Sequence, residues 1–102
     1  MKSVRFEPEA REELLGAVDW YAERDSSLAD RFIATVDGTL VEIGAAPHTF
    51  PLVVEVPRAL NVRKRLLNRF PYAVVFTELD DEVRILAIAH VRRRPGYWRE
   101  RV

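Results

Sequence analysis

The sequence predicts a single α+β domain in which a helical hairpin packs on one face of a small, mostly antiparallel sheet. Two consecutive segments, residues 8–24 and 27–46, repeat their apolar side chains every three or four positions, as an amphipathic helix does. After residue 61 the apolar period changes to two, the period of a β-strand. The chain has 102 residues, of which 48% are hydrophobic, so residues 1–102 suffice for one core and are too few for two.

The first strand and the first helix occupy the start of the chain. Residues 3–6 form a short β-compatible run, and Pro8 is surrounded by four glutamates, which is typical of a helix start: Glu7, Glu9, Glu12 and Glu13. An apolar stripe then leads to about Arg24, through Ala10, Leu14, Ala17 or Val18, and Tyr21. Trp20 and Tyr21 are interpreted as packing residues of this helix.

A second helix follows almost at once. Ser27 with Asp30 resembles a capping box, and an apolar stripe leads from there to about Ala46, through Leu28, Phe32, Val36, Leu40 and Ile43. Only Asp25 to Ser27 connect the two helices, so they must fold back as an antiparallel hairpin. Both stripes then need a third surface to cover them.

The remaining strands come after a loop with three prolines, from Pro47 to about Asn61. Runs at 62–68, 72–79 and 83–91 are rich in β-branched and aromatic residues, and the polar residues 80–82 indicate a hairpin turn. The expected element order is therefore β-α-α-β-β-β. In the last strand, alternation predicts one row facing the helices (Val83, Ile85, Ala87 and Ala89) and one row on the open face of the sheet (Arg84, Leu86, Ile88 and His90).

Composition excludes several kinds of protein and site. The chain has no cysteine, which rules out a disulfide framework, a thiolate zinc site and a cysteine nucleophile, and favours a cytoplasmic protein. No stretch approaches the ~20 apolar residues of a membrane span, so no membrane partner is expected. His48 and His90 lie far apart and no glycine-rich phosphate loop occurs, so the sequence predicts neither a metal site nor a cofactor.

Charge is unevenly distributed, although sixteen basic and sixteen acidic residues cancel. Residues 1–46 contain 5 basic and 10 acidic side chains, whereas residues 47–102 contain 11 and 6. A polyanion is therefore expected to dock on the C-terminal half. Fourteen of the basic residues are arginine, whose planar guanidinium can form two hydrogen bonds with a phosphate, although a GC-rich genome produces the same bias.

His90 is a candidate for proton transfer, because it ends a predicted strand directly before the run Arg92-Arg93-Arg94. Cleavage of RNA through its own 2′-hydroxyl needs a base, cations for the phosphorane and an acid for the departing oxygen. Histidine, arginine and tyrosine can supply these functions without a metal. The alternative is that His90 forms a hydrogen bond with a carbonyl group at the end of a strand.

Further basic and aromatic side chains extend this candidate site. Alternation puts Arg63, Arg65 and Arg69 on one side, and they join His90 if that side is the open face. Alternatively, these charges protect an exposed edge strand against aggregation. Tyr97 and Trp98, after Pro95-Gly96, are placed to stack on bases or to pin the end of the chain to the core.

Three segments of the sequence resemble the RelE/ParE superfamily of bacterial toxins from type II toxin-antitoxin modules, often labelled plasmid-stabilisation proteins. They are residues 6–10 (FEPEA) with 19–21 (DWY), residues 69–72 (RFPY) and residues 85–98 (ILAIAHVRRRPGYW). The similarity covers nearly the whole chain, and β-α-α-β-β-β is the element order of that superfamily. The resemblance implies a small cytoplasmic toxin that inhibits growth and is held inactive by an antitoxin encoded beside it.

The resemblance implies two alternative activities. RelE-like members cut mRNA on the ribosome, whereas ParE-like members inhibit DNA gyrase. For a metal-independent endoribonuclease, the matching positions make Arg93 the phosphate-stabilising arginine, His90 the catalytic imidazole and Tyr97 the tail tyrosine. RNA would be bound by the remaining basic and aromatic candidates, Arg63, Arg65, Arg69, Arg92, Arg94 and Trp98.

The ribosome-dependent nuclease is the leading interpretation of the sequence. Two observations depart from the nuclease pattern: Ala73 follows Tyr72, where RNA-cleaving relatives commonly carry arginine, and the pI is about 6.7, whereas many ribosome-dependent members are strongly basic. A gyrase inhibitor and a degenerate module that only binds its antitoxin are the alternatives.

Overall fold

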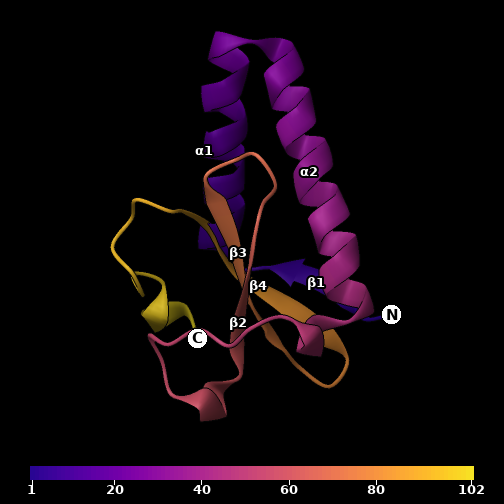
Figure 1. The fold of residues 1–102 in the computed structure, drawn as a ribbon, viewed down its shortest axis with the longest axis vertical. Helices are drawn as coiled ribbons and strands as arrows, with labels where there is room; N and C mark the ends of the chain where they lie inside the picture. The colour runs from indigo at the N-terminus through magenta and orange to yellow at the C-terminus, as the bar shows by residue number, and fades with distance from the viewer.

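The computed structural model describes all residues, 1–102, and has the predicted order of elements (Figure 1). The elements are β1 (Ser3–Phe6), α1 (Pro8–Arg24), α2 (Ser26–Ala45), β2 (Val62–Leu66), β3 (Tyr72–Glu78) and β4 (Glu82–His90). Three short 3-10 turns, Pro47–Thr49, Arg58–Leu60 and Arg99–Arg101, lie in the long loop and at the end of the chain. The change of apolar period thus separated helices from strands correctly.

The four strands form one sheet in the order β1-β4-β3-β2. β4 pairs antiparallel with β3 and parallel with β1, and β3 pairs antiparallel with β2, so the prediction of a mostly antiparallel sheet is confirmed. Beyond β2, the bridge between Leu52 and Arg63 covers part of the outer edge of the sheet. The first strand therefore lies beside the last one, at the edge opposite β2.

The helices form the predicted antiparallel hairpin, which covers one face of the sheet and extends past it (Figure 1). The cap of α2 differs from the prediction, because Asp25 and not Ser27 precedes the helix. The carboxylate of Asp25 accepts hydrogen bonds from the Ser27 amide at 2.9 Å and the Ser27 hydroxyl at 2.8 Å. These two bonds lower the pKa of Asp25, since they favour its ionised form.

The predicted helical stripes form the main core. Their most buried members are Ala10, Ala17 and Tyr21 from α1 and Phe32, Val36 and Ile43 from α2. The rings of Tyr21 and Phe32 lie 5.1 Å apart, and Phe70 and Tyr72 pack against both rings. Tyr21 is thus a packing residue, as predicted, whereas Trp20 beside it keeps 49% of its surface exposed.

A β-bulge in β4 reverses the predicted alternation of its side chains. Val75 lies opposite Ala87 and Phe76 lies opposite Ile85, so Leu86 is an extra residue without a partner on β3. Val83 and Ile85 face the helices as predicted, but the prediction for the second half of the strand is wrong. Ile88 belongs to the core under the helices, whereas Ala87 and Ala89 belong to the cluster on the opposite face. His90, paired with Tyr72, likewise lies on the helical side rather than on the open face.

The face opposite the helices is closed, contrary to prediction. Leu86, which the alternation placed on an open surface, has no exposed surface, and Trp98 is only 3% exposed. A second apolar cluster lies here: Val53, Val62, Val75, Leu86, Ala87, Ala89 and Trp98. The end of the chain and the long loop therefore cover this face, and Trp98 packs in the core as the packing alternative requires.

Neither helix combines the length and the apolar character that crossing a membrane requires.

Candidate functional site

The C-terminal tail, residues 91–102, is held by a carboxylate from the first helix. Arg101 donates to both oxygens of Glu13, with Nη1 2.9 Å from Oε1 and Nη2 3.1 Å from Oε2. The Tyr97 hydroxyl donates to Oε2 of the same carboxylate at 2.6 Å. Paired hydrogen bonds between a guanidinium and a carboxylate are among the strongest in proteins, and here both side chains are 15% exposed. Glu13 therefore fixes the tail against α1.

Glu13 and Arg101 also complete the hydrogen bonding of β4. β1 pairs with β4 only as far as Ile85, because the chain then turns into α1. Beyond that point, the Ile88 amide donates to Glu13 Oε1 at 3.0 Å and Arg101 Nη1 donates to the Leu86 carbonyl at 2.9 Å. Buried backbone groups are costly to leave unpaired, so this pair replaces a missing strand.

Two guanidinium groups lie close to the ring of Tyr97. The Arg93 Cζ atom is 3.8 Å from the centre of its ring and the Arg101 Cζ atom is 5.1 Å away. Burial raises the pKa of the Tyr97 phenol, and the hydrogen bond to Glu13 and the negative charge of Glu13 raise it further. Arg93 and Arg101 lower this pKa, but by less. Tyr97 is consequently a neutral donor to Glu13.

His90 closes the turn that leads into the tail. Its Nδ1 atom accepts a hydrogen bond from the Arg92 amide at 3.1 Å, and its carbonyl accepts one from the Arg93 amide at 3.0 Å. The imidazole meets the ring of Tyr72 edge-on, with 5.0 Å between the ring centres. The hydrogen-bonding alternative for His90 is thus present, although with a backbone amide rather than a carbonyl as partner.

A hollow of about 210 Å³ lies between the sheet and the tail, and is called the tail hollow here. It brings together five of the predicted site residues, His90, Arg93, Arg94, Tyr97 and Trp98. Lys64 and Glu55 also line it, so its charges are mixed. The structure therefore gathers Arg93 and Tyr97 around this cavity, whereas His90 lies at its border and directs its imidazole toward Tyr72 on the helical side.

The three arginines predicted to join this site lie elsewhere. Arg63 and Arg65 lie opposite Phe76 and Val74, which face the helices, so alternation directs both toward the helical side. Arg63 donates to the Phe50 carbonyl at 2.6 Å, and Arg65 lies 3.5 Å from Glu42 of α2. Arg69 lies in the β2–β3 turn with a positive φ of 70°. The condition under which these arginines would join the site, a position on the open face, is therefore not met, and none of the three lines the tail hollow.

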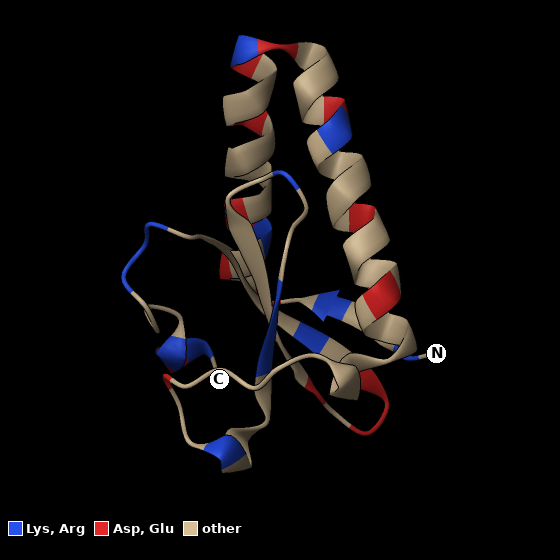
Figure 2. Cartoon of the chain, in the orientation of Figure 1, with Lys and Arg blue, Asp and Glu red and all other residues tan.

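The tail is strongly basic at its surface (Figure 2). Arg92, Arg94 and Arg99 are exposed and take part in no ion pair, and Arg93 lies 3.7 Å from Glu13. Acidic residues, in contrast, are spaced along both helices and gather in the β3–β4 turn. The charge asymmetry of the sequence thus becomes a division of the folded surface, with the tail on its positive side.

Glu13 is the residue that sequence reasoning missed. It was interpreted as one of four glutamates that favour the start of α1, and Glu7, Glu9 and Glu12 have the same local pattern. Its partners Tyr97 and Arg101 are 84 and 88 residues away in the sequence. No signal within the first helix distinguishes it from its neighbours.

Comparison with known proteins gives two positive results. Residues 4–95 match the family described as the ParE toxin of the type II toxin-antitoxin system, parDE. The fold is similar to that of a chain from the chromosomal ParDE toxin-antitoxin system of P. aeruginosa, with a TM-score of 0.63 and 21% sequence identity over 88% of this chain and 96% of that one. No protein with a curated description matches the sequence.

Proposed function

Because the chain belongs to the family of ParE toxins of type II toxin-antitoxin systems, we propose that it inhibits growth by binding DNA gyrase and does not cleave mRNA. Gyrase is the target that the resemblance implies for ParE-like members. As a member of a type II system, the chain has an antitoxin as its partner.

Tyr97 and His90 already form hydrogen bonds within the protein, which supports a non-catalytic mechanism. A general acid or base needs a proton or a lone pair that it can direct at the substrate. The Tyr97 proton is donated to Glu13, and His90 Nδ1 is occupied by the Arg92 amide, which leaves only Nε2 free. Ala73 adds no cation where a nuclease commonly has one. Of the catalytic residues that the sequence predicted, only His90 therefore keeps a free proton-transfer atom, Nε2.

The exposed arginines of the tail support binding to an acidic protein surface. Arg92, Arg94 and Arg99 have no ion-pair partner, so an acidic surface can approach them without breaking a contact inside the toxin. Such charges accelerate association and select the partner. Because Glu13 binds Tyr97 and Arg101, the position of the tail that carries these exposed arginines is fixed.

Two assays on purified protein test this function. The wild-type toxin should inhibit supercoiling by gyrase and leave ribosome-bound mRNA intact. Arg94→Glu should weaken inhibition by about tenfold or more, because it reverses an exposed charge on the tail. Arg11→Glu is the matched control, since Arg11 is also exposed and unpaired but lies on α1, and its inhibition should stay within about twofold of wild type.

Two other outcomes would contradict the proposal that the protein inhibits gyrase. If the wild-type toxin cuts mRNA on ribosomes, and His90→Ala or Arg93→Ala lowers the rate by roughly a hundredfold, the protein is a nuclease and the gyrase proposal is wrong. If soluble expression leaves growth unchanged, the chain is an antitoxin-binding module without toxicity.

A further inference from the structure

The tail hollow exists because a row of small side chains crosses the sheet beneath it. Leu66 of β2 lies opposite Ala73 of β3, and Ala73 lies opposite Ala89 of β4. Both alanines line the hollow and are 8% exposed, whereas Ala87, two residues earlier in β4, has no exposed surface. Alanine side chains are too short to fill the space between the sheet and the tail. The hollow therefore has an open apolar floor.

Two exposed aliphatic side chains line the tail hollow above this floor. Leu66 is 54% exposed and Val91 is 56% exposed. The aromatic rings nearby are not available in the same way, because Trp98 is buried and the ring of Tyr97 is covered by the Arg93 guanidinium, 3.8 Å from its centre. Proteins that bind single-stranded nucleic acid stack the bases on exposed rings. This aliphatic lining therefore suits an apolar protein side chain better than a base.

The charges around the tail hollow favour a partner with carboxylates. Lys64 and Arg94 line the hollow, are exposed and take part in no ion pair. Glu55 is the one acidic residue of the lining, and it lies where the tail approaches the long loop: a Cβ atom on Gly96 would be 3.1 Å from that of Glu55. A partner can place carboxylates at Lys64 and Arg94, whereas a nucleic-acid backbone, with a phosphate on every nucleotide, would also meet Glu55.

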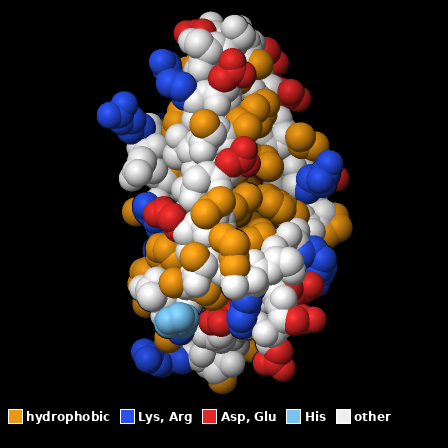
Figure 3. All heavy atoms as spheres, turned by 90° about the vertical axis from the view of Figure 1, so that its right-hand side faces the viewer, with side chains coloured by type: hydrophobic (Ala, Val, Ile, Leu, Met, Phe, Trp, Pro, Cys, Tyr) orange, Lys and Arg blue, Asp and Glu red, His pale blue; other side chains and the backbone are white.

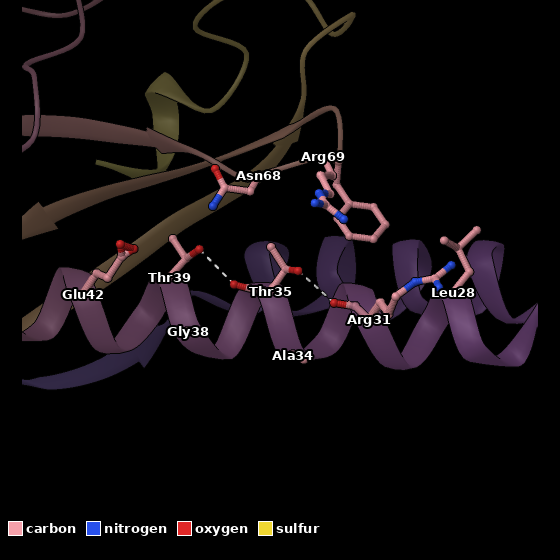
Figure 4. Close-up of a pocket in the computed structure, with 10 residues that line it drawn as sticks. Leu28, Arg31, Ala34, Thr35, Gly38, Thr39, Glu42, Asn68 and Arg69 are labelled. Carbon is pink, nitrogen blue, oxygen red and sulfur yellow. Dashed lines mark hydrogen bonds between the residues drawn. The ribbon is translucent and has the colours of Figure 1, made fainter.

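The tail hollow differs in this respect from the larger hollow on the helical side. That hollow, of about 820 Å³, lies between α2 and the β2–β3 turn, and the hydroxyls of Thr35 and Thr39 in it donate to carbonyls of α2 itself (Figure 4). On the α2 side of the surface, basic and acidic side chains both surround the exposed apolar ones (Figure 3). Neither sign of charge prevails there, so that side indicates no partner of one chemistry.

We propose that the tail hollow receives one apolar side chain of an acidic segment of gyrase, whose carboxylates contact Lys64 and Arg94. This inference rests on the proposed function, because that function supplies the partner. A volume of about 210 Å³ is smaller than the ~300–1,000 Å³ of small-molecule sites and suits a single large side chain. A side chain buried in a pocket at the centre of an interface commonly contributes much of the affinity. The hollow thus adds an apolar centre to the surface formed by the exposed arginines of the tail.

The test measures how strongly the purified full-length toxin inhibits supercoiling by gyrase. Leu66→Ala should weaken inhibition by about tenfold, because it removes an exposed wall of the hollow. Its melting temperature should stay close to that of wild type, since the side chain is more than half exposed. Leu15→Ala is the matched control, because Leu15 is 51% exposed but lies on α1 and does not line the hollow. Its inhibition should stay within about twofold of wild type.

Filling the tail hollow provides a second test. Ala73→Leu puts a longer aliphatic side chain on the floor and should weaken inhibition by about tenfold or more. Ala34→Leu makes the same change on the exposed surface of α2 and should alter inhibition by less than about twofold. Because neither Leu66→Ala nor Ala73→Leu changes a charge, the salt dependence of inhibition should remain that of wild type, whereas Lys64→Glu should reduce it.

The outcomes separate the hollow from the function of the protein. If the wild-type toxin inhibits gyrase and Leu66→Ala inhibits it equally well, the hollow proposal is wrong and the gyrase function stands. Leu66→Ala also decides the question if Ala73→Leu does not fold. If the wild-type toxin cuts ribosome-bound mRNA and Leu66→Ala slows that cleavage, the hollow binds RNA and the proposal fails. If the wild-type toxin leaves supercoiling unchanged, the proposed function fails and the hollow proposal with it.

Discussion

Arg101 and Glu13 form a two-bonded ion pair that joins the last turn of the chain to the first helix. The pair also receives and donates the hydrogen bonds that β4 would otherwise exchange with a neighbouring strand. One contact thus holds the tail, completes the sheet and engages the hydroxyl of Tyr97. The stability of the fold and the presentation of the tail therefore depend on the same carboxylate.

Glu13→Ala should lower the free energy of unfolding by about 2–4 kcal/mol. The change leaves the half-buried guanidinium of Arg101, the Tyr97 hydroxyl and the Ile88 amide without their acceptor. Urea unfolding followed by circular dichroism measures the loss. Glu12→Ala is the control, because Glu12 is an exposed neighbour without an ion pair, and its effect should stay within about 0.5 kcal/mol. Equal effects of the two substitutions would contradict the anchoring role of Glu13.

The stability of the protein should fall as the pH rises above about 10. The folded state raises the pKa of Tyr97 above its ordinary value of 10.0, so below that pH both states keep the proton and Tyr97 causes no pH dependence. Above it, the unfolded chain releases the proton while the folded chain retains it, and unfolding becomes easier. Melting temperatures between about pH 9 and 11 should fall less steeply for Tyr97→Phe than for wild type. Tyr21 and Tyr72, whose pKa values burial also raises, account for the slope that remains. Parallel slopes for the two proteins would show that Tyr97 is not the group responsible.

A chain that ends after Pro95 should be destabilised as well as non-toxic. It lacks Trp98, whose removal alone costs about 3–5 kcal/mol, and Arg101, the partner of Glu13. Leu86 and Ala89 would then be uncovered, so binding of a hydrophobic dye should increase together with the loss of the cooperative melting transition. A truncated chain with the melting temperature of wild type would refute the packing role of Trp98.

His90→Ala should reduce inhibition of gyrase by less than about threefold. The imidazole contacts Tyr72 edge-on and accepts a hydrogen bond from the Arg92 amide. Its loss should therefore disturb the turn rather than the exposed arginines of the tail. Supercoiling assays over a range of toxin concentrations measure the effect, with Arg94→Glu as the variant that should respond strongly. A stronger loss for His90→Ala than for Arg94→Glu would place the active surface at the imidazole.

The fold could be predicted from the sequence because each element buries a regular stripe of its own. Phe32, Val36 and Ile43 recur at helical spacing, and all three are buried. The β-bulge could not be predicted in the same way. It depends on how β4 pairs with β3 at Val75 and Phe76, and neither strand contains a glycine or proline near it that marks an extra residue.

The site was predicted only in part, because its geometry also depends on strand pairing and on contacts between distant parts of the chain. Tyr97 and Arg93 lie close in sequence to His90, and all three residues line the tail hollow. The side chain of His90 was assigned to the wrong face because the bulge shifts every later residue of β4. Glu13 acts through partners at the far end of the chain, and such long-range pairs leave no trace in local periodicity.

The parallel pairing of β1 with β4 also affects how quickly the molecule can fold. Residues 3–6 must find residues 82–85, so the chain must close a loop of nearly its whole length before the sheet is complete. Contacts between such distant parts slow folding, whereas the helical hairpin needs only neighbouring residues. During synthesis, the hairpin can form as soon as α2 has emerged, but the edge of β4 and the anchor of the tail must wait for the final residues. A newly made chain therefore passes through a period in which its helices are formed and its arginine-bearing tail is not yet in place.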